Sequence, residues 1–175
     1  MKQILFWRII DPETKTRLPY GEFSNFARYP FTVNGIRYQT SEHYYQSTKF
    51  LDEENQRAVI NAPDAKSAAA IGRDPNRPLR PDWEDVKVDV MREAVWHKFI
   101  SYPGLILSLI NTGDAEIIED SPIDWYWGWG KDHTGKNMLG KVLMDLRAEL
   151  LKLGYTADSF KEEPVHEYKL TSLIK

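Results

Sequence analysis

The clearest hydrophobic pattern in the chain lies in residues 137–153. Leucine or valine recurs there at the spacing of one face of an α-helix, which predicts a helix that packs against the core. The positions concerned are Leu139, Val142, Leu143, Leu146, Leu150 and Leu153. Gly140 stands beside this stripe, where a larger residue would favour the helix more. We therefore expect tight packing or a nearby ligand at Gly140.

A second helix is predicted over residues 83–100. Its apolar face consists of Trp83, Val86, Val90 and Ala94, with Met91 beside them. Lys87 projects toward the same side, and two interpretations of it stay open. Such a lysine commonly extends its charged end to water, and the alternative is an amine held in a binding site. A shorter helix is predicted over residues 64–71, with start and stop signals in the right order, and a compact apolar helix over residues 104–111, closed by Thr112-Gly113.

Strand patterns are few. Residues 3–10 and 116–119 each predict a strand, and Asn34-Gly35 between two short apolar segments predicts a hairpin over residues 31–38. We expect an α+β fold: a mainly helical single domain, with a small antiparallel sheet formed by the N-terminal strand and the hairpin. The predicted domain covers residues 1–153, and residues 154–175 form a polar C-terminal extension.

The segment 40–50 combines polar and aromatic residues without any Gly or Pro. Thr40 or Ser41 can cap a helix, and in that helix Glu42, Gln46 and Lys49 would form one polar stripe. Its flanks are the aromatic residues Tyr44, Tyr45 and Phe50. Buried polar groups reduce stability unless they are paired, which favours a functional role. The alternative is that Glu42 stabilises the helix N-terminus and Lys49 is a solvated surface residue.

Two further segments have compositions typical of loops that contact ligands. In residues 20–26 we expect Phe23 and Phe26 to point inward and Glu22, Ser24 and Asn25 to face a ligand; the alternative is that Ser24 and Asn25 cap a turn. Residues 120–130 combine acids with four aromatic residues and with Gly128 and Gly130, which permit close backbone approach.

Arg73, Arg77 and Arg80 follow the helix predicted over residues 64–71. Guanidinium groups on an irregular segment suit phosphate binding. A solvated linker is the alternative.

Composition narrows the class of protein. Of the 175 residues, 42% are hydrophobic and the net charge is -3, which fits a globular protein that does not bind nucleic acid through bulk charge. The chain contains no cysteine, so thiolate chemistry and disulfides are excluded. Its start is too short an apolar run for a signal peptide and no stretch is long enough to span a membrane, so we expect a cytoplasmic protein. The four histidines lack the spacing of metal ligands.

Many short blocks of the sequence, taken together, resemble the YbiA-like, or NADAR (NAD- and ADP-ribose-associated), family of N-glycosidases. The resemblance covers roughly residues 6–151. The blocks are residues 20–26 and 40–50, Ala65-Lys66, Gly72-Arg73, Trp83 with Lys87 and Met91, Lys98-Phe99, residues 112–114, Asp124, Trp127-Gly128, Gly130, Asn137, Leu139-Gly140, Leu143-Met144 and Arg147.

The resemblance implies hydrolysis of the C1–N bond between a phosphorylated ribose and a pyrimidine- or purine-like base, without a metal or cofactor. The expected substrates are phosphoribosylamino-pyrimidine intermediates of riboflavin biosynthesis. The alternative is removal of ADP-ribose from guanine in modified nucleic acid. In either case the partner is a phosphoribosyl or ADP-ribosyl compound.

The resemblance also indicates roles for individual residues. Glu42 and Asp124 are the acids at positions similar to the functional ones of the family, and Lys49, with Lys87 as second choice, is the amine if the reaction is covalent. Trp83 and Trp127 are candidates for stacking on the base. Arg73, Ser24 and Asn25 are candidates for binding the phosphate or ribose. Gln46, Gly128 and Asn137 complete the predicted substrate-binding set.

Two other classes of function stay open on the sequence alone. One is a module that binds ADP-ribose or NAD without cleaving it, in which Glu42 and Lys49 would be dispensable for affinity. The other is a structural or toxin–antitoxin partner protein, whose aromatic loop at residues 120–130 would dock another protein.

Overall fold

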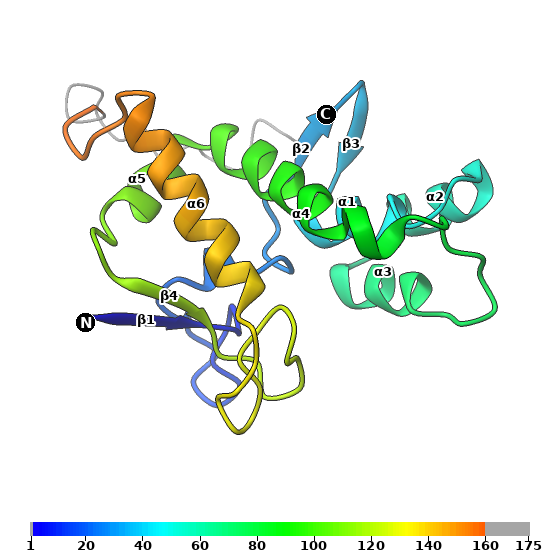
Figure 1. Cartoon of the computed structure of the whole chain (residues 1–175), viewed down its shortest axis with the longest axis horizontal. Coiled ribbons are helices and arrows are strands. Elements are labelled where there is room, and N and C mark those ends of the chain that lie inside the picture. The colour runs from blue at the N-terminus through cyan, green and yellow to red at the C-terminus, as the bar shows by residue number, and fades with distance from the viewer. Residues whose placement is uncertain (1, 160–175) are drawn as a thin grey trace.

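The computed structural model describes residues 2–159, so the predicted C-terminal extension lies outside the described residues from residue 160 onward. The elements follow the chain as β1 (Gln3–Phe6), a 3-10 turn (Gly21–Phe23), β2 (Phe31–Val33), β3 (Ile36–Tyr38), α1 (Ser41–Ser47), α2 (Glu53–Ile60), α3 (Ala65–Gly72), α4 (Trp83–Ile100), α5 (Pro103–Ile110), β4 (Glu116–Glu119) and α6 (Met138–Lys152) (Figure 1). This is the mainly helical α+β fold expected from the sequence.

The strands form two separate pairs. β2 and β3 make the predicted hairpin, whose turn residues Asn34 and Gly35 both have positive φ angles, 49° and 80°. β1 does not join this hairpin, and that part of the prediction is wrong. It pairs in parallel with β4, with Gln3 opposite Glu116. A parallel pair needs a long connection between its strands, and here most of the domain supplies it.

The N-terminal strand is also shorter than predicted, ending at Phe6 rather than at Ile10. β4 offers partners only as far as Phe6, which lies opposite Glu119. Beyond that point, Ile10 forms only an isolated bridge with Arg17.

Side-chain caps mark the start of the first three helices. Thr40, Asp52 and Asp64 each accept a hydrogen bond from the backbone N–H three residues further on. The sequence analysis did not predict α2, whose apolar residues Ala58, Val59 and Ile60 all lie at its end and of which only Val59 is buried.

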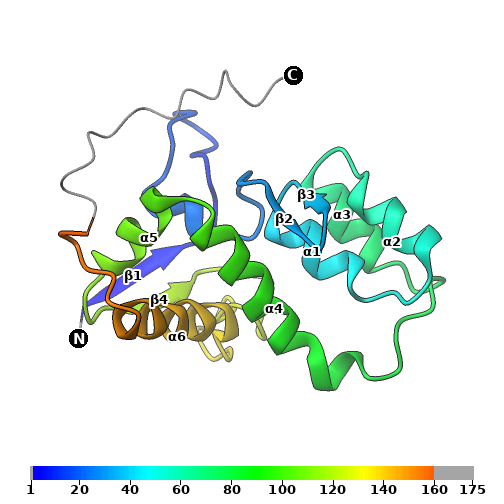
Figure 2. The same ribbon diagram turned by 90° about the horizontal axis from the view of Figure 1, so that it is seen from above.

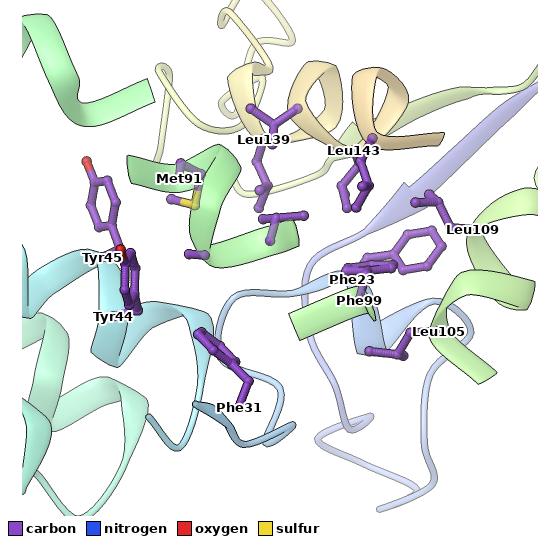
Figure 3. Packing of buried hydrophobic residues seen from close by; sticks show 14 of the residues in the cluster. Phe23, Phe31, Tyr44, Tyr45, Met91, Phe99, Leu105, Leu109, Leu139 and Leu143 are labelled. Atoms are coloured by element: carbon purple, nitrogen blue, oxygen red, sulfur yellow. The ribbon is translucent and has the colours of Figure 1, made fainter. Parts of the chain in front are cut away.

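Helix α4 lies between two groups of elements (Figure 2). On one side are α1, α2, α3 and the hairpin; on the other are α5, α6 and the β1–β4 pair. α4 packs against α1, α5 and α6, and α6 packs against β4. Figure 3 shows the continuous core, which extends from Tyr45 past Met91 to Phe99 and Leu143. Within the described residues, no helix has the length and apolarity needed to cross a membrane.

The predicted stripe of α6 is buried with one exception. Leu153 is 57% exposed, because α6 ends at Lys152 and Gly154 turns the chain with a φ of 88°. Gly140 lies against the carbonyl oxygen of Ile117 on β4, where a β-carbon would collide. The close contact explains this glycine as a packing residue.

Candidate active site

Helix α1 is polar in sequence and buried along its whole length. It contacts α2, α3 and α4, which surround it. Glu42 and Gln46 are 4% and 2% exposed, so neither is an ordinary surface residue. Burying polar groups costs free energy unless they are paired. The buried polar side chains of α1 therefore favour a functional site at this helix.

Glu42 is held by two contacts. Its side chain accepts a hydrogen bond of 2.6 Å from Gln46 Nε2, and its backbone N–H donates to the carbonyl oxygen of Asn25 at 3.1 Å. Burial raises the pKa of Glu42, while the hydrogen bond from Gln46 and the charges of Arg73 and Lys49 oppose that rise. The carboxyl is therefore fixed in position inside a poorly solvated region.

Lys49 lies just beyond the end of α1 and is half-buried. Its amine donates to the carbonyl oxygen of Gly72 at 3.1 Å and lies 5.6 Å from the rings of both Tyr45 and Trp83. Burial lowers the pKa of Lys49, and the charge of Glu42 opposes that effect. Lowering the pKa increases the fraction of neutral, nucleophilic amine.

Three aromatic rings connect the parts of the site. The ring of Tyr45 packs edge-on against Trp83 of α4 at 4.9 Å and against Trp127 of the 120–130 loop at 5.4 Å. Trp83 is 5% exposed and forms a wall, whereas Trp127 is half-buried and has a more accessible ring. The structure thus brings the aromatic loop to the polar helix.

Asp124 organises the loop that carries Trp127. Its Oδ1 accepts hydrogen bonds from the backbone N–H groups of Tyr126 and Trp127, at 2.8 and 2.7 Å. Its charge also raises the pKa of Glu42. Gly128, next in the chain, lies so close to the carbonyl oxygen of Glu119 that a β-carbon would approach it to 2.7 Å.

Of the three arginines, only Arg73 faces the site. Arg77 is bound to Asn55 and Asp74, and Arg80 to Asp82. In the part of the chain that the structure describes, Arg73 has no ion pair or side-chain hydrogen bond, although its charge acts on Glu42 and Lys49. It is exposed and free to bind an anion.

The other predicted residues are engaged with the protein. Lys87 forms an ion pair with Glu84 and lies 4.1 Å from the ring of Tyr126, so it borders the site. Ser24 Oγ accepts from the backbone N–H of Phe26 at 3.3 Å, as the turn-capping alternative required. Phe26 itself is 39% exposed, so its predicted inward orientation is wrong.

Asn25 and Asn137 are both buried. Asn25 Nδ2 contacts Met91 Sδ at 3.1 Å, and its Oδ1 has no hydrogen-bond partner within the described residues. Asn137 uses both amide atoms on β4, donating to the carbonyl oxygen of Ile117 and accepting from the backbone N–H of Glu119. Asn137 therefore holds the end of β4.

Glu119 is the site residue that the sequence analysis missed. It ends β4 and is half-buried, and its Oε2 is buried without a hydrogen-bond partner in residues 2–159. Burial raises the pKa of Glu119 to about 8, and the charges of Asp124 and Glu42 add to the rise. One sequence signal could have indicated Glu119 as a candidate. It is a carboxylate that directly follows the apolar pair Ile117-Ile118, at the end of the predicted strand that precedes the aromatic loop.

The acids do not form a metal site. Across residues 2–159, no three His, Asp or Glu side chains are arranged to hold a metal ion. A surface hollow of about 440 Å³ lies elsewhere, between α4 and α6, where Trp96, Val142 and Leu146 line it. It contains none of the predicted site residues, so we assign the site from the side-chain contacts around Glu42.

The chain is similar to known proteins over most of its length. The NADAR domain model matches residues 6–151. N-glycosidase YbiA of Escherichia coli K12 is 45% identical over 131 residues, covering 75% of this chain and 82% of that protein.

Two further matches extend the comparison. An NMR structure of Escherichia coli YbiA matches with a TM-score of 0.78 at 38% identity, covering 95% of this chain and 92% of that one. A riboflavin biosynthesis protein of Vibrio vulnificus is 42% identical over 75% of this chain and 36% of its own length. The chain belongs to the NADAR domain family and is an N-glycosidase.

Proposed function

We propose that this N-glycosidase hydrolyses the C1–N bond between a phosphorylated ribose and a pyrimidine- or purine-like base. The preferred substrate is a phosphoribosylamino-pyrimidine of riboflavin biosynthesis. The observation that supports the proposal is the position of the Lys49 amine, which interacts electrostatically with Glu42 and lies 5.6 Å from the rings of Tyr45 and Trp83. The ring of Tyr45 in turn packs against that of Trp127. The name of the Vibrio vulnificus relative supports the choice of pathway.

The chemistry of the bond explains why these groups belong together. Cleavage builds positive charge on C1 and the ring oxygen and negative charge on the departing nitrogen. The Glu42 carboxylate, held by Gln46, stabilises the positive charge. Water attacks C1 directly, or Lys49 attacks first and forms a Schiff base that water then hydrolyses. The ring of Trp127 stacks on the base, and Arg73 binds the phosphate.

The test is a panel of substrates with detection of the released base. We expect release from a phosphoribosylamino-pyrimidine and little from ADP-ribosylated guanine in DNA or RNA. Release from the modified guanine alone would replace the proposed substrate by ADP-ribosylated nucleic acid. No release from any substrate, together with micromolar affinity for ADP-ribose, would contradict catalysis and indicate a binding module.

A further inference from the structure

The end of β4 brings a third carboxyl group to the site. The charges of Asp124 and Glu42 both raise the pKa of Glu119, and the charge of Asp124 also raises the pKa of Glu42. Carboxyl groups that interact in a buried region repel one another when all of them are ionised. One of them is therefore expected to keep its proton at neutral pH.

The surroundings of the three carboxyls differ. Burial raises the pKa of Glu42, but a hydrogen bond from Gln46 and two nearby cations, Arg73 and Lys49, oppose that rise and support its ionised form. Asp124 Oδ1 accepts two backbone N–H bonds, so this carboxyl group has hydrogen-bond partners within its own loop.

Glu119 has neither kind of support. Its Oε2 is buried without a hydrogen-bond partner among the described residues. Its neighbours on the packed elements, Phe6 of β1 and Asn137 before α6, carry no charge. From α1 it faces Glu42 and from the loop Asp124, and both of these negative charges favour the protonated form of Glu119.

We propose that Glu119 is the general acid that protonates the departing nitrogen of the base. This role rests on the proposed function, since it needs a C1–N bond to cleave. As the bond breaks, its electron pair goes to nitrogen together with the Glu119 proton, and C1 takes the oxygen of a water molecule. The proton released by that water restores the acid form of Glu119. If Lys49 attacks first, the same C1–N bond breaks and the same nitrogen needs a proton.

The position of Glu119 fits this role. Two hydrogen bonds hold the backbone of Glu119 in place. Its N–H donates to Asn137 Oδ1 at 3.0 Å, and its carbonyl oxygen accepts from the backbone N–H of Trp129 at 3.1 Å. The backbone is therefore fixed, while the buried Oε2 has no hydrogen-bond partner among residues 2–159. General-acid catalysis requires such a positioned group with a pKa near the working pH.

The test compares two leaving groups in one enzyme. The first substrate is the phosphoribosylamino-pyrimidine, whose nitrogen needs a proton to depart. The second is 4-nitrophenyl β-ribofuranoside 5-phosphate, whose nitrophenolate leaves as a stable anion without one. The variant is Glu119→Gln, and Glu116→Gln is the matched control, since Glu116 lies at the other end of β4 and binds only the exposed Gln3 side chain.

We expect Glu119→Gln to lower kcat on the pyrimidine substrate by about 10²- to 10⁴-fold and to leave nitrophenolate release near the wild-type rate. Glu116→Gln should behave as wild type with both. In the wild type, kcat/KM on the pyrimidine substrate should fall above the Glu119 pKa of about 8, and this fall should be absent in Glu119→Gln and absent with the nitrophenyl substrate.

Equal losses on both substrates, or no loss on either, would overturn the role of Glu119. If Glu119→Gln does not fold, the wild-type pH profiles decide: a fall at high pH with both substrates, or with neither, contradicts the proposal. Failure of the proposed function is distinct, because the wild type would then release neither base nor nitrophenolate.

Discussion

Replacing Lys98 by methionine is expected to remove a large pH dependence from the free energy of unfolding. Lys98 is 1% exposed, and burial lowers its pKa to about 7. Its amine donates hydrogen bonds to the carbonyl oxygens of Glu22 and Ser24, at 2.5 and 2.9 Å. Below pH 7 the ammonium is charged in both the folded and the unfolded state, so the folded protein bears the whole cost of burying it.

The size of the effect follows from proton linkage. Above pH 7 the folded protein releases the Lys98 proton, whereas the unfolded chain retains it up to about pH 10.4. The unfolded state then binds more protons, and the free energy of unfolding rises with pH. With a native pKa of about 7, the rise between pH 6 and pH 9 is about 2–3 kcal/mol.

The assay is urea unfolding of wild type and Lys98→Met at intervals of one pH unit across this range. Lys141→Met, at an exposed lysine of α6, is the matched control. Glu119 has the opposite effect, because its raised pKa makes stability fall as pH rises from about 4.3 to about 8. That contribution is common to all three proteins and cancels in the differences between them.

The absolute stability of Lys98→Met is not the readout, because Glu22 and Ser24 lose the donor to their carbonyl oxygens. Lys98→Gln, whose amide can still donate, replaces it if the methionine variant does not fold. Stability curves of wild type and variant that stay parallel from pH 6 to pH 9 would refute the reasoning, since they would show that Lys98 keeps its proton when folded.

Three further predictions concern the site. Glu42→Gln should lower kcat by about 10²-fold or more with little change in Tm, because the amide fills the same space; an unfolded variant would instead indicate a structural role. Borohydride added during turnover should trap a sugar adduct on Lys49 if the reaction is covalent, and full activity of Lys49→Ala without any adduct would eliminate that route. Arg73→Ala should raise KM for the 5′-phosphorylated substrate and leave KM for the dephosphorylated analogue unchanged, with Arg77→Ala as the control; equal changes would contradict phosphate binding.

The sequence predicted the elements whose signals are local. The Asn34-Gly35 turn, the Thr40 cap and the apolar stripe of α6 each depend on residues within a few positions of one another. The polar stripe of residues 42–49 and the loop of residues 120–130 stood out for a related reason. Each places charged groups among aromatic residues, which is unfavourable in a core without a further role.

What the sequence could not predict depends on contacts between distant segments. The pairing of β1 with β4 joins residues more than a hundred positions apart, and no local pattern encodes such a partner. Glu119 was missed because the charges that act on it, those of Glu42 on α1 and Asp124 in the aromatic loop, come from other segments than its own strand. Phe26 was expected inside by residue type alone, although the turn capped by Ser24 leaves it at the surface.

Three buried oxygen atoms around Glu42 lower the stability of the fold, which favours a functional explanation for them. Asn25 Oδ1, Gln46 Oε1 and Glu119 Oε2 are buried without hydrogen-bond partners among the described residues. Each such group costs about 1–3 kcal/mol, so the folded protein would gain stability if these groups were apolar. The amide oxygens of Asn25 and Gln46 suit the donors of a ligand, such as ribose hydroxyls, whereas the protonated carboxyl proposed for Glu119 supplies a donor of its own. A protein selected for stability alone would not contain these groups, so their presence favours a role in binding or catalysis.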